Sequence, residues 1–261
     1  MTITSACAAS PEQPNSVPAA PNSLQTLIDN ASKGDPNAQC LLGVKYFYGR
    51  GILQDYNEAI KWLTKAAEQG NANAQFDIGL IYNKGKIIPQ DYNEAFEWFL
   101  QAAEQSDATA QCAIAGMYRY GRGVAQNSKE AFKWYKKAAE QGDTNGQCAL
   151  GIMYFIGEGA PQNYTEALKW LNEAAEKDDG NAQLCLITLY YEGEGVRKDY
   201  VEAYRWALLA GINGKDVAKI KEEIASQMTP DQIAEAEKRA KEFVAKKERE
   251  KTEDANFPDL K

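Results

Sequence analysis

The chain has 261 residues, of which 44% are hydrophobic and 25% are charged, with a net charge of -8. This acidic balance disfavours binding to nucleic acid or to an anionic membrane surface, because both require clustered Lys and Arg. The sequence contains no histidine. The commonest general base and the commonest zinc ligand are therefore missing, and we expect neither a cofactor nor a metal site.

The first 23 residues are rich in Ala, Pro, Ser and Asn, a composition typical of a disordered segment. As written, this segment lacks the basic and apolar regions of a signal peptide, so we expect a cytoplasmic protein. The run Ala6-Cys7-Ala8 resembles the end of a cleaved leader, however. If the true start lay upstream, the protein would be periplasmic or secreted. Residues 24–36 follow as a predicted N-terminal capping helix.

Residues 37–216 contain a repeat with a period of 36 residues. The five tryptophans occur at this interval, beginning with Trp62 and Trp98. Tyr46, Gly49 and Glu58 begin further series with the same spacing. A fixed period without insertions indicates a solenoid, in which every unit packs against similar neighbours. We therefore predict five helix-turn-helix repeats of an all-α fold.

Each repeat predicts two helices. In the first repeat, the apolar residues between Ala38 and Tyr46 follow helical spacing. Gly49 and Gly51 then interrupt the helix, and residues 59–67 supply the second apolar stripe. The second helix should end near Gly70, where a left-handed glycine is favourable.

Short polar residues mark the helix starts. Asp35 precedes the first helix and Asp55 precedes the second, and their equivalents in the other repeats are all Asp or Asn. Such side chains accept hydrogen bonds from unpaired backbone N–H groups at N-cap positions. Glu58 lies three residues after Asp55, which resembles a capping box. The recurring glutamate is therefore interpreted as structural rather than catalytic.

The pattern changes after Trp206. We predict C-terminal capping helices over residues 217–250 and a disordered tail over residues 251–261. The run Thr229-Pro230-Asp231-Gln232 fits the start of the last helix, with Thr229 as N-cap and Pro230 as the first helical residue. Apolar residues between Ile233 and Val244 form one stripe that can pack against the last repeat.

The repeat unit resembles a known family. Its pattern AQ-x-x-L/I-G-x-x-Y-x-x-G-x-G, followed by D-Y-x-E-A-x-x-W-x-x-x-A-A-E-x-G, is similar to the Sel-one-like repeat (SLR), a bacterial relative of the tetratricopeptide repeat. The resemblance implies stacked helix pairs in a right-handed superhelix that serves as an adaptor for protein complexes. Ile87, Ala115 and Ile187 depart from the glycines of this pattern, so the local loop shape or helix approach is in doubt there.

Cys40, Cys112 and Cys148 share one register of the repeat, and Cys185 lies one position away from it. Equivalent residues of neighbouring repeats should be about 8–10 Å apart. A disulfide requires Cα atoms within about 7 Å, so we predict buried thiols rather than disulfides. No spacing typical of a zinc site occurs.

Residues that vary between repeats at the ends of the first helices are the candidate binding residues. Aromatic residues and Arg are favoured anchors at protein interfaces. We predict a concave face that binds a partner protein or peptide, with the following residues as the site: Tyr48, Lys84, Arg119, Tyr120, Phe155 and Tyr191. The alternative is that many of these aromatic rings only pack between helices. The strictly recurring Tyr46 and Trp62 series are interpreted as core rather than as a ladder for sugars or bases.

Two other functions remain as alternatives. An exported β-lactamase-like or penicillin-binding repeat protein would need the motif S-x-x-K, which is absent, and a catalytic triad would need histidine. An envelope-tethered structural adaptor is the other alternative. We therefore expect a protein that is not an enzyme, is monomeric, and does not insert directly into a membrane.

Overall fold

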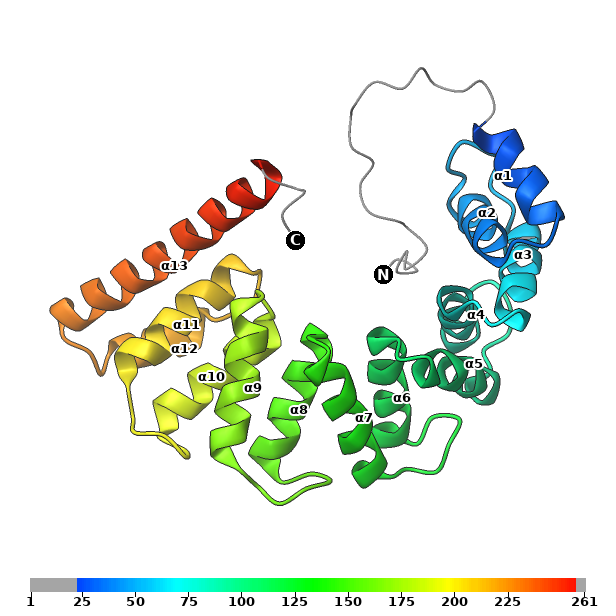
Figure 1. The fold of residues 1–261 in the computed structure, drawn as a ribbon. Helices are drawn as coiled ribbons and strands as arrows, with labels where there is room; N and C mark the ends of the chain where they lie inside the picture. Colours follow the sequence, from blue (N-terminus) through cyan, green and yellow to red (C-terminus); the bar gives the residue numbers. More distant parts are fainter. Residues whose placement is uncertain (1–22, 257–261) are drawn as a thin grey trace. The chain divides into compact units, whose positions relative to one another are not determined.

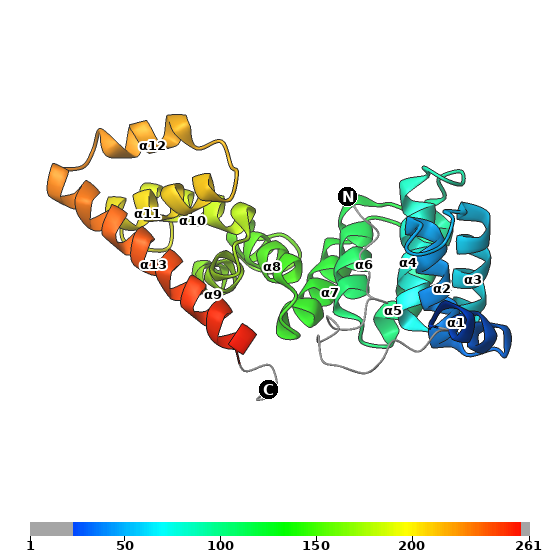
Figure 2. The same cartoon turned by 90° about the horizontal axis from the view of Figure 1, so that it is seen from above.

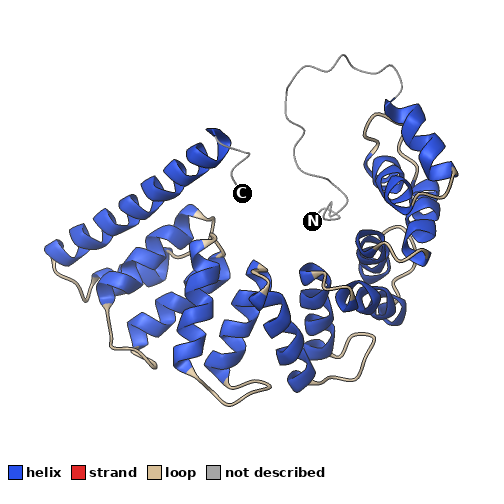
Figure 3. Cartoon of the chain, viewed as in Figure 1, coloured by secondary structure: helices blue, strands red, loops and turns tan. Residues whose placement is uncertain are grey.

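A computed structural model describes residues 23–256, which form helices joined by short turns (Figure 1). Within this range there is no strand (Figure 3). Residues 1–22 and 257–261 lie outside the described residues, and with them nearly all of the segment 1–23 that we expected to be disordered. The chain divides into two compact units, residues 1–141 and residues 142–261.

Unit 1 holds the N-terminal capping helix and three helix pairs. Its helices are α1 (Ser23–Ser32), α2 (Pro36–Tyr48), α3 (Tyr56–Glu68), α4 (Ala72–Lys84), α5 (Tyr92–Glu104), α6 (Ala108–Tyr120) and α7 (Ser128–Glu140). Each of these helices packs against the next one in the chain. The predicted pairing of helices is thus confirmed in this unit, and α1 lies in the region predicted for a capping helix but ends at Ser32.

Unit 2 holds two helix pairs and the C-terminal cap. Its helices are α8 (Thr144–Ile156), α9 (Tyr164–Glu176), α10 (Gly180–Glu192), α11 (Tyr200–Ile212), α12 (Ala218–Ala225) and α13 (Pro230–Asn256). Both α12 and α13 pack against α11 (Figure 2). The predicted end of the cap at residue 250 is wrong, because α13 continues to Asn256. Lys and Glu favour helix, and the Lys246–Glu250 ion pair supports this last stretch.

The predicted caps are confirmed. The Asp55 carboxylate accepts hydrogen bonds from the backbone N–H groups of Asn57 and Glu58, at 2.8 and 3.1 Å. Equivalent Asp or Asn side chains cap the other helices of the repeats. The first helices end at a left-handed glycine, for which Gly49 with φ of 67° is an example. Local chemistry therefore fixes the boundaries of these helices.

The glutamate half of the predicted capping box is wrong. Glu58 does not reach back to the cap but accepts from Lys61 Nζ at 2.7 Å. The backbone N–H of Asp55 donates instead to the carbonyl of Tyr46, at 3.1 Å. The same backbone bond recurs in every repeat, between Asp91 and Tyr82, Asn127 and Tyr118, Asn163 and Tyr154, and Asp199 and Tyr190. It ties the start of each second helix to the end of the first.

At the start of α13 the predicted box is present. The Thr229 N–H donates to Gln232 Oε1 at 2.9 Å, and the Gln232 N–H donates to Thr229 Oγ1 at 3.3 Å. Both partners satisfy a backbone donor that the helix itself leaves unpaired.

Buried glutamines join successive repeats. Gln111 donates to the carbonyl of Ala103 at 3.1 Å and accepts from Gln141 Nε2 at 2.8 Å. Gln75 makes the equivalent bonds to Ala67 and Gln105. We call this arrangement the glutamine link. It satisfies a carbonyl at the end of one second helix and an amide at the end of the next, so three helices share one buried polar contact.

The core alternates small and large residues across facing helices. A Cβ added at Gly79 would lie 2.6 Å from the ring of Phe99, so only glycine permits this approach. At the departure Ile187, the residue at the position equivalent to Phe99 is Ala207, and both residues are buried. The large side chain is therefore on the first helix of this pair instead of the second, and the two helices still pack together. At the departure Ile87, the backbone is not left-handed, so this turn differs from its neighbours.

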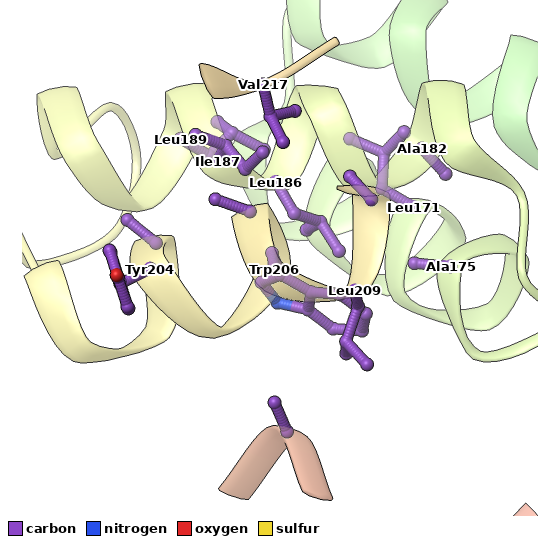
Figure 4. Packing of buried hydrophobic residues seen from close by; sticks show 14 of the residues in the cluster. Leu171, Ala175, Ala182, Leu186, Ile187, Leu189, Tyr204, Trp206, Leu209 and Val217 are labelled. Atoms are coloured by element: carbon purple, nitrogen blue, oxygen red, sulfur yellow. The ribbon is translucent and has the colours of Figure 1, made fainter. Parts of the chain in front are cut away.

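In unit 2 the core is continuous with the C-terminal cap. Leu171, Leu186, Leu189 and Trp206 are fully buried and belong to one cluster (Figure 4). The Trp206 indole meets the ring of Phe243 on α13, with centroids 6.1 Å apart. The predicted stripe of the last helix therefore packs on the last repeat.

The tryptophan series is only partly core. Trp206 and Trp170 are buried, whereas Trp62, Trp98 and Trp134 are half-buried. Cations cover some of these half-exposed rings: Lys137 Nζ lies 4.0 Å from the centroid of Trp134. Trp62 and Trp134 are therefore each partly covered by a lysine ammonium group.

Cys112, Cys148 and Cys185 form no disulfide, as predicted, but only Cys148 is buried, whereas Cys112 and Cys185 are half-buried. Cys40 is disulfide-bonded, so the prediction of a thiol is wrong at that position. Burial raises the pKa of Cys185 to about 11.

Candidate partner-binding site

The four predicted residues in unit 1 lie at equivalent helix ends. Tyr48, Lys84 and Tyr120 are the last residues of α2, α4 and α6, and Arg119 precedes Tyr120. A left-handed glycine follows each of these ends, which fixes the direction in which the helix terminates. Tyr120 is 60% exposed. Tyr48, Lys84 and Arg119 are half-buried.

Tyr120 belongs to a cluster of aromatic rings and cations. The guanidinium carbon of Arg122 lies 5.5 Å from the Tyr120 centroid and 5.8 Å from that of Tyr92. The guanidinium carbon of Arg119 lies 5.6 Å from the Tyr120 ring. Because Tyr92 is the first residue of α5, the cluster joins the turn of one repeat to the second helix of the preceding repeat.

A smaller version of this contact lies in the first repeat. The guanidinium carbon of Arg50 is 4.7 Å from the centroid of Tyr48. The Tyr48 ring meets Phe47 edge-on, with centroids 5.1 Å apart. Arg50, Arg122 and Tyr92 were not predicted from the sequence. The available signal was the arginine between the two loop glycines, which recurs in the first and third repeats.

The two predicted residues in unit 2 are engaged in packing. The Phe155 ring lies 5.9 Å from Tyr164, and the Tyr191 ring lies 5.7 Å from Tyr200. Each ring thus packs on the first residue of the following helix. The Tyr191 hydroxyl also donates to Glu223 on α12, at 2.8 Å, and this bond raises the pKa of Tyr191. Both side chains therefore fit the alternative in which the aromatic rings pack between helices.

One buried acid was not anticipated from the sequence. Asp77 on α4 is fully buried, and neither of its carboxylate oxygens has a hydrogen-bond partner. Burial, with a smaller contribution from Asp107, raises its pKa from 3.8 to about 8, while Lys84 acts in the opposite direction. The other repeats have Leu, Ala or Cys at this position. A carboxyl group without access to solvent is not a catalytic candidate.

The described residues offer little else for chemistry. Between residues 23 and 256 there is no cluster of potential metal ligands. No helix in that range is both long and apolar enough to span a bilayer. A pocket of about 600 Å³ in unit 1 is lined by Trp134, Lys137, Glu104 and Glu140, among others. Its lining combines an aromatic ring with side chains of both charges.

Comparison with known proteins agrees with this geometry. The model of the Sel1 repeat matches residues 36–71, 72–107, 108–143, 144–179 and 180–215. No curated protein matches the chain.

Two solved structures are similar at 34% sequence identity. A protective antigen with an SLR fold from uropathogenic Escherichia coli has a TM-score of 0.72, and the match covers 74% of this chain and 42% of the antigen. A Sel1 repeat protein from Oxalobacter formigenes has a TM-score of 0.70, and that match covers 77% of this chain and 86% of the other. The chain thus spans less than half the length of the antigen.

Proposed function

Since this chain belongs to the Sel1 repeat family, we propose that it is a non-enzymatic scaffold that binds a partner protein or peptide through the ends of its first helices. The observation that carries this proposal is the position of Tyr120, which is exposed and has two guanidinium groups within 5.6 Å of its ring centroid. Tyr and Arg dominate the binding energy of many interfaces, because they bury large surfaces and retain a polar group.

The other predicted residues support this proposal to different degrees. Tyr48 and Lys84 occupy the same helix-end position as Tyr120, and a partner that contacts consecutive repeats of unit 1 would meet all three. Phe155 and Tyr191 use their rings in packing, and they enter the proposal only through their remaining half-exposed surface. The concave face across the whole array stays a prediction.

Site-specific crosslinking tests the proposal. A photoreactive benzoylphenylalanine replaces Tyr120 in the full chain, and the same residue replaces Lys136 as the control. Lys136 is exposed on α7 and lies outside the aromatic cluster. We expect a discrete crosslinked protein at position 120 in cells of the source organism, and none at position 136.

The crosslinked partner is then purified and its affinity is measured. Tyr120→Ala and Arg119→Glu should each weaken binding by about tenfold or more, because loss of an interface anchor costs about 2 kcal/mol. Lys136→Glu should leave the affinity unchanged. Equal affinity of the wild type and both site variants would refute the proposed site.

A further inference from the structure

The charge of one turn position separates the two units. The residue between the two positions of the loop glycines is Arg50, Lys86 or Arg122 in the three repeats of unit 1. In unit 2 the same position holds Glu158 and Glu194. We call Arg50, Lys86 and Arg122 the cationic row. All three are exposed, on a chain whose net charge is -8, so the row is a local reversal of the overall sign.

The turns that carry the row begin in the same way. Each starts at a left-handed glycine, with φ of 67° at Gly49, 62° at Gly85 and 66° at Gly121, although the second turn differs after Lys86, where Ile87 replaces the second glycine. The turn of the third repeat also packs on the second repeat, because a Cβ at Gly123 would clash with the carbonyl of Tyr92. Tyr92 directly follows the turn of the second repeat, so these two turns are neighbours and not independent loops.

The cations of the row are available to a ligand. Among residues 23–256, no carboxylate forms an ion pair with Arg50, Lys86 or Arg122. Arg50 lies over Tyr48, and Arg122 lies near both Tyr92 and Tyr120. A guanidinium near an aromatic ring keeps N–H groups that can bind a carboxylate. Contact with the ring also restricts the side chain before binding, which lowers the entropy lost on association.

The position of the row at the turns of three consecutive repeats suggests an extended ligand. We take the separation of packed helices, on the order of 10 Å, as the step from one turn to the next. An extended peptide advances about 3.3 Å per residue, so carboxylates at every third residue would match successive turns. The tyrosines beside the row add apolar surface for side chains between those carboxylates.

We propose that the cationic row of unit 1 binds an extended acidic segment of the partner protein. This inference rests on the scaffold function proposed above and specifies the chemistry of the partner. Unit 2 has the opposite charge at the equivalent turns, so it should not share this preference. The chain thus contains one end suited to acidic segments, although its composition as a whole is acidic.

Binding of labelled peptides to the purified full chain tests this inference. The probe is a fluorescein-labelled peptide with glutamate at every third residue and serine and tyrosine between. Its counterparts carry glutamine or lysine in place of glutamate, and oligothymidylate tests for nucleic acid. We expect fluorescence anisotropy to show binding of the glutamate peptide only, weakening as salt is raised because exposed ion pairs are screened.

Charge reversal locates the site. The triple variant Arg50→Glu, Lys86→Glu and Arg122→Glu should bind the glutamate peptide at least about tenfold more weakly. The matched control reverses three exposed lysines of α7: Lys129→Glu, Lys133→Glu and Lys136→Glu. It changes the net charge equally and should retain the affinity. Circular dichroism confirms that both variants are folded.

Several outcomes would overturn the inference. These are no binding of the glutamate peptide at low salt, an equal loss in the control variant, or tighter binding of oligothymidylate. The scaffold proposal fails separately. A partner that crosslinks at position 120 but binds the row variant normally would refute the acidic segment and retain the scaffold. If the glutamate peptide binds the row but no partner crosslinks at position 120, the scaffold proposal is refuted and the binding of acidic peptides by the row is retained.

Discussion

Replacing Asp77 with alanine should stabilise the protein, and the gain should grow from acidic to mildly alkaline pH. The folded chain holds this carboxyl group in the core without a hydrogen-bond partner, and its pKa is raised from 3.8 to about 8. Alanine already occupies the equivalent positions 113 and 149. The substitution therefore restores a residue that the repeat accommodates.

The sign and size of the effect follow from proton binding. Between about pH 4 and pH 8 the folded chain keeps a proton on Asp77 that the unfolded chain has lost. The contribution of Asp77 to the free energy of unfolding is therefore most favourable below pH 4 and is lost as the pH rises through about 8. Each pH unit in this window lowers the free energy of unfolding by about 1.4 kcal/mol. At neutral pH the cost is about 4 kcal/mol, of which a cavity left by the smaller side chain would offset part.

Urea unfolding followed by circular dichroism, at acidic and mildly alkaline pH, measures this difference. We expect the free energy of unfolding of Asp77→Ala to exceed that of the wild type by about 2–4 kcal/mol at the higher pH, and by less at the lower pH. Asp77→Asn is the matched control, since it keeps the shape and polarity but cannot titrate. A wild type whose pH dependence equals that of Asp77→Asn would refute the reasoning.

Three further predictions concern backbone strain, the glutamine link and a thiol. Ser106 has φ of 69°, where three other repeats have glycine, so Ser106→Gly should raise stability by about 1 kcal/mol in thermal unfolding. Gln111→Leu leaves the Ala103 carbonyl without its partner, and we expect a loss of about 1–3 kcal/mol in the same assay. Cys185 has a pKa raised from 9.0 to about 11, so peptide mapping should show alkylation about a hundredfold slower than in the urea-unfolded chain.

Each of these has a contrary result. A destabilised Ser106→Gly would mean that the serine side chain contributes more than the strain costs. An unchanged Gln111→Leu would show that water replaces the glutamine without loss. Equal alkylation rates in the folded and unfolded chains would contradict the burial of Cys185.

The features of the fold that could be predicted from the sequence are those that depend on residues close together in the chain, such as helix caps and helix ends. Asp55 caps a helix because the N–H groups that it binds are two and three residues away. Gly49 ends a helix because of its own backbone conformation. Repetition of such local signals at one interval is enough to predict five helix pairs, and a single repeat could not have done so.

Contacts between repeats could not be predicted in this way. Arg122 meets Tyr92 across thirty residues of sequence, and only the packing of one turn on the preceding repeat brings them together. Glu58 had two partners within reach, a backbone N–H and Lys61, and the sequence does not decide between them. The burial of Asp77 likewise depends on neighbouring helices. The predicted residues of unit 1 lie at the helix ends, but the prediction omitted Arg122 and Tyr92, which are half of the cluster around Tyr120.

The glutamine link also determines how the length of the array can change. If residues 72–107 were removed, Ala108 would follow Asn71, as Ala72 does now. Gln111 would then face the carbonyl of Ala67, which is the acceptor that Gln75 uses at present. The new junction would use the same glutamine link as the existing ones. Duplication or loss of a gene segment that encodes one whole repeat could therefore lengthen or shorten such a protein while the glutamine link between repeats is kept.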